Sequence, residues 1–167
     1  LAIVGGGVIG VEWASLLTDL GVQVTIIEFG PTILPQEDVE IAEAMTTFLQ
    51  KRGVQIYVNT AVGADNVEVM SDAVSLALDG ESYRFDKMLI AIGRSANVQN
   101  IGLENTDVVV EDGFIQVNAQ YQTKESHMYA IGDVIGGLQL AHVASHEGML
   151  AVEAIAGRKV EPLKSAL

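Results

Sequence analysis

The sequence predicts an α/β fold in which a parallel sheet carries helices on one face and an antiparallel β-meander on the other. Three observations support this prediction. Up to residue 60, short β-branched runs alternate with longer helical patterns. Glycines stand where the predicted strands end, and after residue 60 the apolar residues alternate with a period of two.

The first predicted strand, residues 1–4, is an apolar run that stops at glycine. A helix follows, ends at Gly21, and leads into a second strand at residues 22–27 that stops at Glu28. The apolar residues of this first helix recur at helical spacing, which predicts a stripe formed by Ile9, Trp13, Leu16, Leu17 and Leu20.

A second helix is predicted at residues 37–52, with acids in its first turns and Lys51 and Arg52 in its last. The third strand, residues 54–58, lies parallel to the first two by the right-handed crossover rule. The apolar stripe of this helix consists of Ile41, Met45, Phe48 and Leu49.

Beyond residue 60, alternating valines and leucines predict an antiparallel meander with a hairpin turn at Asp79-Gly80. Residues 88–92 read as a return to the parallel sheet. A further turn is predicted at Asp112-Gly113, a strand at 127–131 and a final helix at about 142–156.

Composition excludes several classes. The formal net charge of −13 opposes a polyanion, so no nucleic-acid partner is expected, and no apolar run reaches the roughly 18 residues of a membrane span. Because the sequence contains no cysteine, a thiol nucleophile and a zinc-thiolate site are excluded from this chain. The abrupt apolar start at Leu1 suggests a piece of a longer protein.

The strongest motif is Gly5-Gly6-Gly7-Val8-Ile9-Gly10, which fits G-x-G-x-x-G directly after a predicted strand. Gly5 would permit a tight turn, Gly7 the approach of a pyrophosphate, and Gly10 close packing of helix on strand. Glu28 lies 18 residues after the last glycine. Its carboxylate could accept both ribose hydroxyls of NAD and would repel the 2′-phosphate of NADP. The alternative is a tight turn without a ligand.

A second glycine-rich edge follows residues 127–131. Asp133 stands between Gly132 and Gly136 at the end of that predicted strand, which suits either a nucleotide contact or a turn aspartate. Gly93 would let a flat ring approach the end of the 88–92 strand. Arg94 is either a ligand contact or a surface cation.

Together these motifs resemble the pyridine-nucleotide-disulfide oxidoreductases. Three stretches carry the resemblance: the glycine motif with Val11-Glu12-Trp13-Ala14-Ser15, then Ala91-Ile92-Gly93-Arg94, and finally residues 123–148. The last stretch contains Tyr129-Ala130-Ile131-Gly132-Asp133 and Leu140-Ala141-His142 and resembles the family's second FAD-binding motif. Ala96 departs from the family pattern, which usually has proline there.

The resemblance implies a role for each matching residue. The loop of Gly5, Gly6, Gly7, Val8, Ile9 and Gly10 would hold NAD together with Glu28. Val62 would lie beside the adenine, Gly93 near the nicotinamide, and Glu12 near the contact of nicotinamide and flavin. The matching FAD residues are Asp133 at the ribityl–pyrophosphate region and Gln139, Leu140, Ala141 and His142 near the flavin ring.

The resemblance further implies a Rossmann-like NAD-binding domain at residues 1–117 and a segment at 118–167 that returns to an FAD-binding domain. It is closest to the NAD-dependent, cytoplasmic members that oxidise dihydrolipoyl groups on the lipoyl-bearing component of 2-oxo acid dehydrogenase complexes. Those members are homodimers and use a cysteine pair and a His–Glu pair that have no counterpart here. We therefore expect no catalytic residue in this chain and no turnover by it alone.

Two alternatives remain open. The chain could belong to another FAD-dependent disulfide reductase of the same family, although Glu28 argues against members that use NADPH. It could also be a non-catalytic NAD-binding module.

Overall fold

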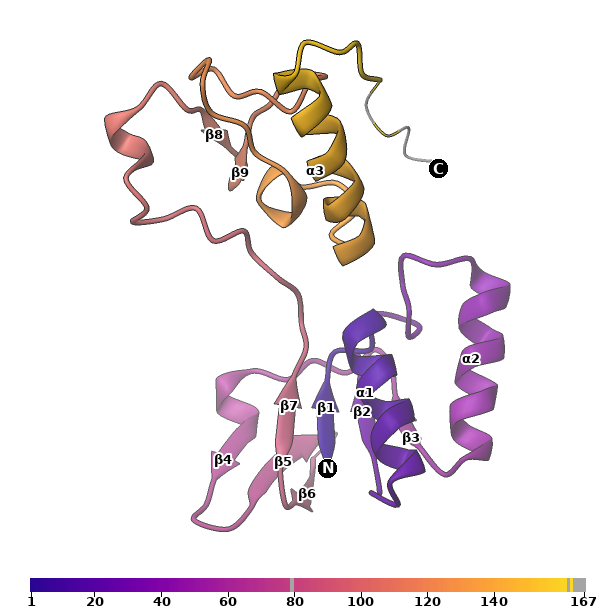
Figure 1. Cartoon of the computed structure of the whole chain (residues 1–167). Helices are drawn as coiled ribbons and strands as arrows, with labels where there is room; N and C mark the ends of the chain where they lie inside the picture. Colours follow the sequence, from indigo (N-terminus) through magenta and orange to yellow (C-terminus); the bar gives the residue numbers. More distant parts are fainter. Residues whose placement is uncertain (79, 162, 164–167) are drawn as a thin grey trace. The chain divides into compact units, whose positions relative to one another are not determined.

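The computed structural model describes residues 1–78, 80–161 and 163. The chain divides into two compact units, Leu1–Gly93 and Arg94–Leu167, and each is described by itself (Figure 1). This division concerns compactness. The boundary near residue 118, which concerns which segments serve NAD and FAD, stays a prediction.

The first unit is built on a four-stranded parallel sheet in the order β3-β2-β1-β7. In this sheet Ile3 stands opposite both Ile26 and Leu89, so the carboxyl ends of the strands meet at one edge. The strands are β1 (Ala2–Val4), β2 (Thr25–Ile27), β3 (Gln55–Tyr57) and β7 (Met88–Ile90). All four predicted strands of the parallel sheet are confirmed, each shorter than its apolar run.

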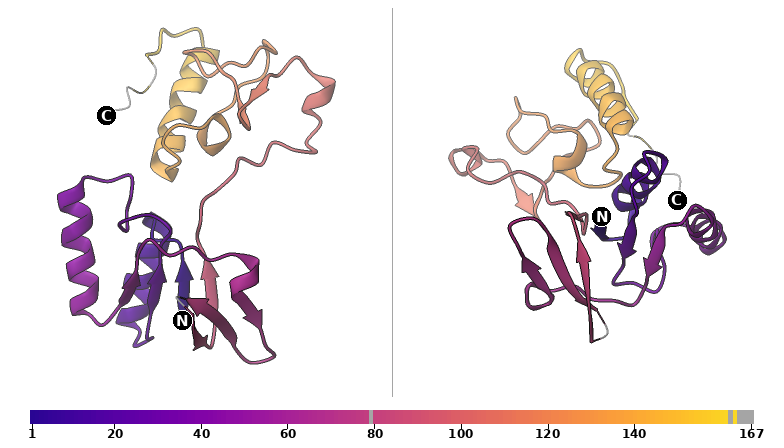
Figure 2. Two further views of the ribbon diagram at one scale, coloured as in Figure 1. Left: turned by 180° about the vertical axis from the view of Figure 1, so that it is seen from behind. Right: turned by 90° about the horizontal axis from the view of Figure 1, so that it is seen from below.

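Two helices, α1 (Val8–Asp19) and α2 (Val39–Lys51), cover one face of this sheet (Figure 2, right). The Asp38 carboxylate accepts the Glu40 N–H and caps α2. Successive strand residues point to opposite faces, so alternate positions face the helices. The core on this side includes Ile3, Ile26, Val11, Ala14, Ala42 and Leu49.

The opposite face of the sheet carries the predicted antiparallel meander. Its strands are β4 (Val67–Val69), β5 (Val74–Leu78) and β6 (Glu81–Phe85), preceded by the short helix η1 (Ala64–Asn66). Asp79 of the predicted Asp79-Gly80 turn lies outside the described residues, and Gly80 has a positive φ of 81°. The second core cluster is formed by Ala2, Val4, Ile27, Leu76 and Leu78.

An aromatic pair reinforces the contact between sheet and meander. The rings of Tyr57 and Tyr83 meet edge to face with centroids 5.9 Å apart. Hydrogen bonding with Tyr57, and then with the Glu81 carboxylate, raises the pKa of Tyr83 to about 12.

Most of the apolar stripe predicted for the first helix points away from the sheet, and of its five residues Leu17 packs against the core. Gly10, Val11 and Ala14 are the buried residues of α1. The small side chains lie inward because the helix approaches the sheet closely, and most of the large ones point outward. The exposed fractions are 37% for Ile9, 45% for Trp13, 51% for Leu16 and 70% for Leu20. The stripe predicted for α2 is divided: Leu49 is buried and Met45 packs on the core, whereas Ile41 and Phe48 are exposed.

The second unit contains little regular structure. Its elements are η2 (Leu103–Asn105), β8 (Val110–Glu111), β9 (Phe114–Ile115), η3 (Gly132–Ile135) and α3 (Ala141–Ile155). The turn between β8 and β9 is the predicted Asp112-Gly113 pair, with φ values of 51° and 83°. Helix α3 confirms the predicted final helix to within one residue at each end.

The strand predicted at residues 127–131 is wrong. Tyr129 makes only an isolated antiparallel bridge with Gln122. An extended segment becomes a strand only when a neighbour supplies a ladder of hydrogen bonds. Here the bridge is flanked by only two backbone bonds among the described residues, from the Ala130 N–H to the Tyr121 carbonyl and from the Thr123 N–H to the Met128 carbonyl.

No helix in the described ranges is both long enough and apolar enough to cross a membrane. The same residues contain no cluster of three or more His, Cys, Asp or Glu suited to a metal ion.

Candidate functional site

The glycine loop joins β1 to α1 at the carboxyl edge of the parallel sheet. Gly5 has φ of 107°, and a Cβ there would stand 2.3 Å from the Ala91 carbonyl oxygen. A Cβ on Gly10 would stand 2.0 Å from the Gly5 carbonyl oxygen. Neither position can carry a side chain without moving backbone. The steric roles predicted for these two glycines are therefore present in the structure.

The first turn of α1 is open to an anion. Its N-cap is Gly7, which has no side chain to cap the helix, and no acid lies in the first turn. The helical hydrogen bonds begin with the Val11 N–H, which donates to the Gly7 carbonyl at 3.0 Å. The preceding amides of the turn therefore have no partner in the helix ladder and lie at the positive end of its dipole. A Cβ on Gly7 would meet nothing within 4 Å, so this side of the loop is free.

Glu28, the predicted ribose ligand, follows β2 and reaches back to the glycine loop. Its Oε2 accepts the Gly6 N–H at 2.6 Å and its Oε1 accepts the Gly30 N–H at 2.6 Å. Both carboxylate oxygens therefore have backbone partners, a contact that the sequence did not predict. A carboxylate offers about four acceptor sites, so two hydroxyl donors could still be accommodated.

Three other predicted residues of the first unit lie at different depths. Gly93 lies two residues after Ala91. The Ala91 N–H donates to the Val4 carbonyl at 2.7 Å, so this segment runs beside the glycine loop. Val62 is half-buried against the meander-side core. Glu12 is exposed on α1.

In the second unit, Asp133 lies on η3 and is tied to Arg94. The Arg94 guanidinium lies 3.4 Å from Asp133 Oδ2 and donates to the Gln139 carbonyl at 2.9 Å. Arg94 is thus not an isolated surface cation, because it connects two of the predicted FAD residues, Asp133 and Gln139. Its role as a ligand contact stays a prediction. Leu140 is the N-cap of α3, and Ala141 and His142 are exposed in its first turn.

Sequence reasoning missed Glu147, a buried acid on α3. Its Oε2 accepts the Gly132 N–H at 2.7 Å and so fixes the residue before Asp133. A signal was available, because Glu147 shares one helical face with Ala144 and Ala151, and an acid on a small-residue face is a candidate for a buried contact.

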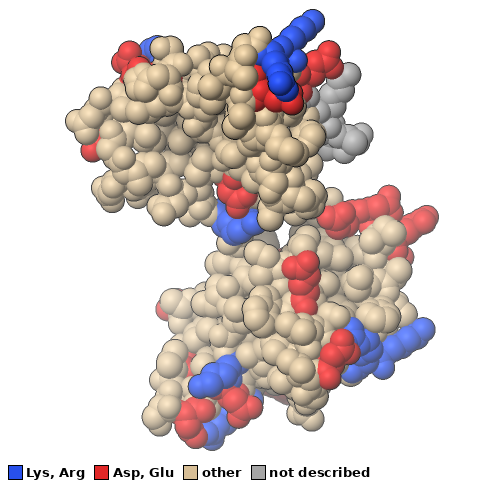
Figure 3. All heavy atoms as spheres, in the orientation of Figure 1, with Lys and Arg blue, Asp and Glu red and all other residues tan. Residues whose placement is uncertain are grey.

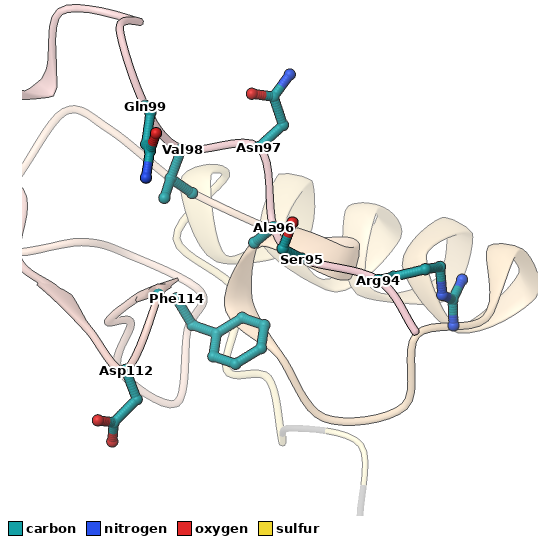
Figure 4. Close-up of a pocket in the computed structure, with 9 residues that line it drawn as sticks. Arg94, Ser95, Ala96, Asn97, Val98, Gln99, Asp112 and Phe114 are labelled. Carbon is teal, nitrogen blue, oxygen red and sulfur yellow. The ribbon is translucent and has the colours of Figure 1, made fainter. Parts of the chain in front are cut away.

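A cavity of about 470 Å³ lies in the second unit (Figure 4). None of the predicted FAD residues lines it, but its lining residue Arg94 pairs with Asp133. Figure 4 shows the Phe114 ring directed toward the Ser95–Ala96 segment, whereas Arg94 and Asn97 point away from it. The lining residues are Arg94, Ser95, Ala96, Asn97, Val98, Gln99, Asp112, Gly113 and Phe114.

Acidic side chains gather at the N-terminal end of α2, where Glu37, Asp38 and Glu40 are exposed (Figure 3). The glycine loop has no acid in the first turn of its helix. The negative net charge of the chain is thus compatible with anion binding at α1.

A comparison with protein-family models decides the family. The model described as "Pyridine nucleotide-disulphide oxidoreductase" matches residues 1–148, which span the glycine loop, Asp133 and Glu147. The chain belongs to the pyridine nucleotide-disulphide oxidoreductase family. The family resemblance and the α/β fold class predicted from the sequence are both confirmed.

Curated relatives carry the name dihydrolipoyl dehydrogenase. One, from Bacillus subtilis strain 168, is 56% identical over all of this chain and 36% of its own length. Another, from Zymomonas mobilis, is 40% identical over 99% of this chain and 36% of its own length. The chain therefore spans about a third of the length of the curated relatives it matches.

Solved structures of this family have the same fold. LpdA from Mycobacterium tuberculosis matches with a TM-score of 0.87 at 30% identity, covering 98% of this chain and 36% of that one. The Escherichia coli RclA in its Cu(II) complex, titled a HOCl-induced flavoprotein disulfide reductase, matches with a TM-score of 0.88 at 30% identity. This match covers 96% of this chain and 37% of the RclA chain.

Proposed function

We propose that this chain is the NAD-binding part of a flavoprotein dihydrolipoyl dehydrogenase. The observation that carries the proposal is the glycine loop: a strand, a turn that only glycine can make, and a helix start with uncapped amides, next to an acid at the end of β2. The 56% identity to a dihydrolipoyl dehydrogenase supports the specific activity within the family.

The residues present fit a dinucleotide. The amides of Val8, Ile9 and Gly10 would hold the pyrophosphate at the positive end of α1. Glu28 would accept the adenosine ribose hydroxyls with the acceptor sites that Gly6 and Gly30 leave free. The carboxylate would repel a 2′-phosphate, and no Arg or Lys lies between Glu28 and Lys51 to bind one, which favours NAD over NADP.

We assign the remaining positions by the same proposal. Val62 would flank the adenine, and Gly93 would leave room for the nicotinamide. Glu12, exposed on α1, would lie near the contact of nicotinamide and flavin.

The second unit supplies residues toward FAD. Asp133, held by Arg94 and by the bond from Gly132 to Glu147, would bind the ribityl–pyrophosphate region. Gln139 and the start of α3, including Leu140, Ala141 and His142, would approach the flavin ring. When bound, the two cofactors supply the hydride-transfer and electron-relay chemistry of the reaction.

The disulfide chemistry lies outside this chain, since its sequence has no cysteine. We therefore propose that the intact enzyme, a homodimer that oxidises dihydrolipoyl groups of a 2-oxo acid dehydrogenase complex, brings its thiols on other segments. This chain alone should bind NAD weakly and should not turn over dihydrolipoamide.

Calorimetric titration of the 167-residue chain tests the proposal. We expect NAD to bind and NADP to bind at least about tenfold more weakly, a difference of about 1.4 kcal/mol. A Glu28→Arg variant should shift the ratio toward NADP, whereas Glu43→Arg, which changes an exposed acid on α2, should not. Equal affinity for both nucleotides in the unsubstituted chain, or turnover of dihydrolipoamide by it, would refute the proposal.

A second candidate is another FAD-dependent disulfide reductase, favoured by the likeness to RclA. A preference for NADP in the same titration would support it. The remaining alternative, a non-catalytic NAD-binding module, predicts only that the chain binds NAD. It would gain support if the chain bound NAD but no flavin in any context.

A further inference from the structure

We infer that Glu28 is a positioning residue that shapes the glycine loop in the absence of any nucleotide. Together with the turn that ends at Leu34, its carboxylate holds both backbone groups of Gly6. We call Glu28, Gly30, Ile33 and Leu34 the loop clamp. The inference deepens the proposed function and rests on it only for the identity of the ligand.

The first arm of the clamp is the carboxylate. The Glu28 backbone is fixed in the sheet region, because its N–H donates to the Tyr57 carbonyl at 2.8 Å and its carbonyl accepts the Thr60 N–H at 2.9 Å. From this base the side chain accepts the amides of Gly6 and Gly30 at 2.6 Å each. Hydrogen bonds to an ionised acceptor are about twice as strong as neutral ones.

The second arm is the turn after Gly30. The Leu34 N–H donates to the Gly6 carbonyl at 2.8 Å, so both backbone groups of Gly6 are engaged. Ile33 is completely buried, and a Cβ on Gly6 would stand 2.9 Å from its Cγ2. The turn packs directly against the loop.

Leu34 shows that this arm is held under strain. It is buried and has φ of 51°, the left-handed region that a leucine rarely adopts. Such a conformation persists when surrounding contacts over-determine it, and such residues cluster at functional sites. Here the over-determining contacts include the bond to Gly6 and the burial of Ile33.

The clamp has a consequence for specificity. The Gly6 amide is committed to Glu28, so phosphate recognition falls to the amides that follow it in the loop and first turn. The acid that would read the ribose therefore also sets the shape of the loop that would hold the phosphates. A substitution of Glu28 should change both at once, and the affinity for NAD and for NADP should fall even where their ratio shifts.

Amide hydrogen exchange on the ligand-free, full 167-residue chain tests the clamp. In the unsubstituted chain, the Gly6 and Gly30 amides should be protected, although they donate to a side chain and not to a backbone ladder. In Glu28→Ala both should exchange at least about tenfold faster, as expected when a charge-assisted bond is lost. The matched control Glu43→Ala, at an exposed position on α2, should leave both rates unchanged.

Glu28→Gln is the second variant, for the case that Glu28→Ala does not fold. Only one of the two terminal atoms of glutamine can accept, so at least one of the two amides should lose protection. Unchanged exchange at both amides in a folded variant, or no protection in the unsubstituted chain, would overturn the inference. Because no nucleotide is present, these outcomes leave the proposed NAD binding untouched, and a failure to bind NAD leaves the clamp untouched.

Discussion

The two units of the chain are stabilised in different ways. The first unit, Leu1–Gly93, places its buried side chains in two clusters, one on each face of a parallel sheet. In the second unit, Arg94–Leu167, the two strands among the described residues are two residues long each, and neither core cluster includes a described residue of this unit. Its described buried positions are apolar residues outside these clusters, together with the polar Thr123 and the acid Glu147.

This difference shows how each candidate site is shaped. In the first unit the apolar core fixes the strand ends, and the glycine loop is then set by the steric limits of its glycines together with the Glu28 and Ile33 side chains. In the second unit, side-chain-to-backbone bonds hold the loop that carries Asp133, through Glu147 on one side and Arg94 on the other. Substitutions of the glycines and buried apolar residues of the first unit should therefore act through sterics and packing, whereas substitutions of Glu147 and Arg94 in the second unit should act through single polar contacts.

The largest effect is expected from Gly10→Ala. Its Cβ would stand 2.0 Å from the Gly5 carbonyl oxygen, so backbone must move, and unit 1 should lose more than about 3 kcal/mol. Urea unfolding followed by the fluorescence of Trp13, the sole tryptophan, measures this loss.

Gly7→Ala is the matched control in the same loop. Gly7 has φ of −70° and free space at its Cβ position, so the loss should stay below about 1 kcal/mol. This variant should instead weaken NAD binding. Equal destabilisation by the two substitutions would contradict the steric account of the loop.

The next effect distinguishes the two units. Ile26→Ala removes a completely buried side chain from the helix-side cluster and should cost about 2–5 kcal/mol. Ile115→Ala, at a 7% exposed position of β9 outside both clusters, should cost less, about 1–2 kcal/mol, because the cost depends on the surrounding packing.

Circular dichroism and Trp13 fluorescence together measure these two losses. Only Ile26→Ala should move the fluorescence transition, since Trp13 lies on α1. If Ile115→Ala moved it as far, the second unit could not be treated as a separately stabilised region.

A third, smaller effect is expected from Glu147→Ala. The substitution leaves the Gly132 N–H without its acceptor and should cost about 1–3 kcal/mol. Exchange of the Gly132 amide reports it directly. Glu153→Ala, on the same helix with an exposed ion pair to Arg158 at 3.7 Å, is the control and should cost under about 0.5 kcal/mol. Similar losses for the two would mean that Glu147 does not hold the loop.

The smallest effect on stability is expected from Arg94→Lys. The ion pair with Asp133 is exposed, so stability should change by less than about 1 kcal/mol. Lysine is a point charge without the planar fork that bridges Asp133 and the Gln139 carbonyl. The amide resonances of Asp133 and Gln139 should therefore shift in nuclear magnetic resonance spectra, and spectra identical to those of the unsubstituted chain would contradict the bridge.

Most of the first unit could be predicted from the sequence because its signals are local. Its glycine positions and β-branched runs depend on the conformations that individual residues allow, and the same is true of the Asp112-Gly113 turn in the second unit. The second unit was harder to predict because its long-range contacts leave little periodicity. The extended segment at 127–131 reads as a strand locally, yet only a neighbouring strand could make it one.

The orientation of α1 illustrates the same limit within the first unit. Periodicity identified the helix from an apolar stripe of large residues such as Trp13 and Leu16. The sheet instead accepts Gly10, Val11 and Ala14, because a helix that starts from a tight glycine turn lies too close to β1 for large side chains. Which face is buried depends on the distance between helix and sheet, which no local pattern encodes.

The sequence by itself determined the family, the α/β fold class and the identity of the glycine motif with its acid, since each depends on residue type and spacing. Only the tertiary structure decided what those residues touch. It placed the Glu28 carboxylate on the amides of Gly6 and Gly30, and it brought Arg94 to Asp133 and Glu147 to Gly132. The reason is physical: these bonds join residues between 2 and 39 positions apart, and only the packed chain fixes the geometry a hydrogen bond requires.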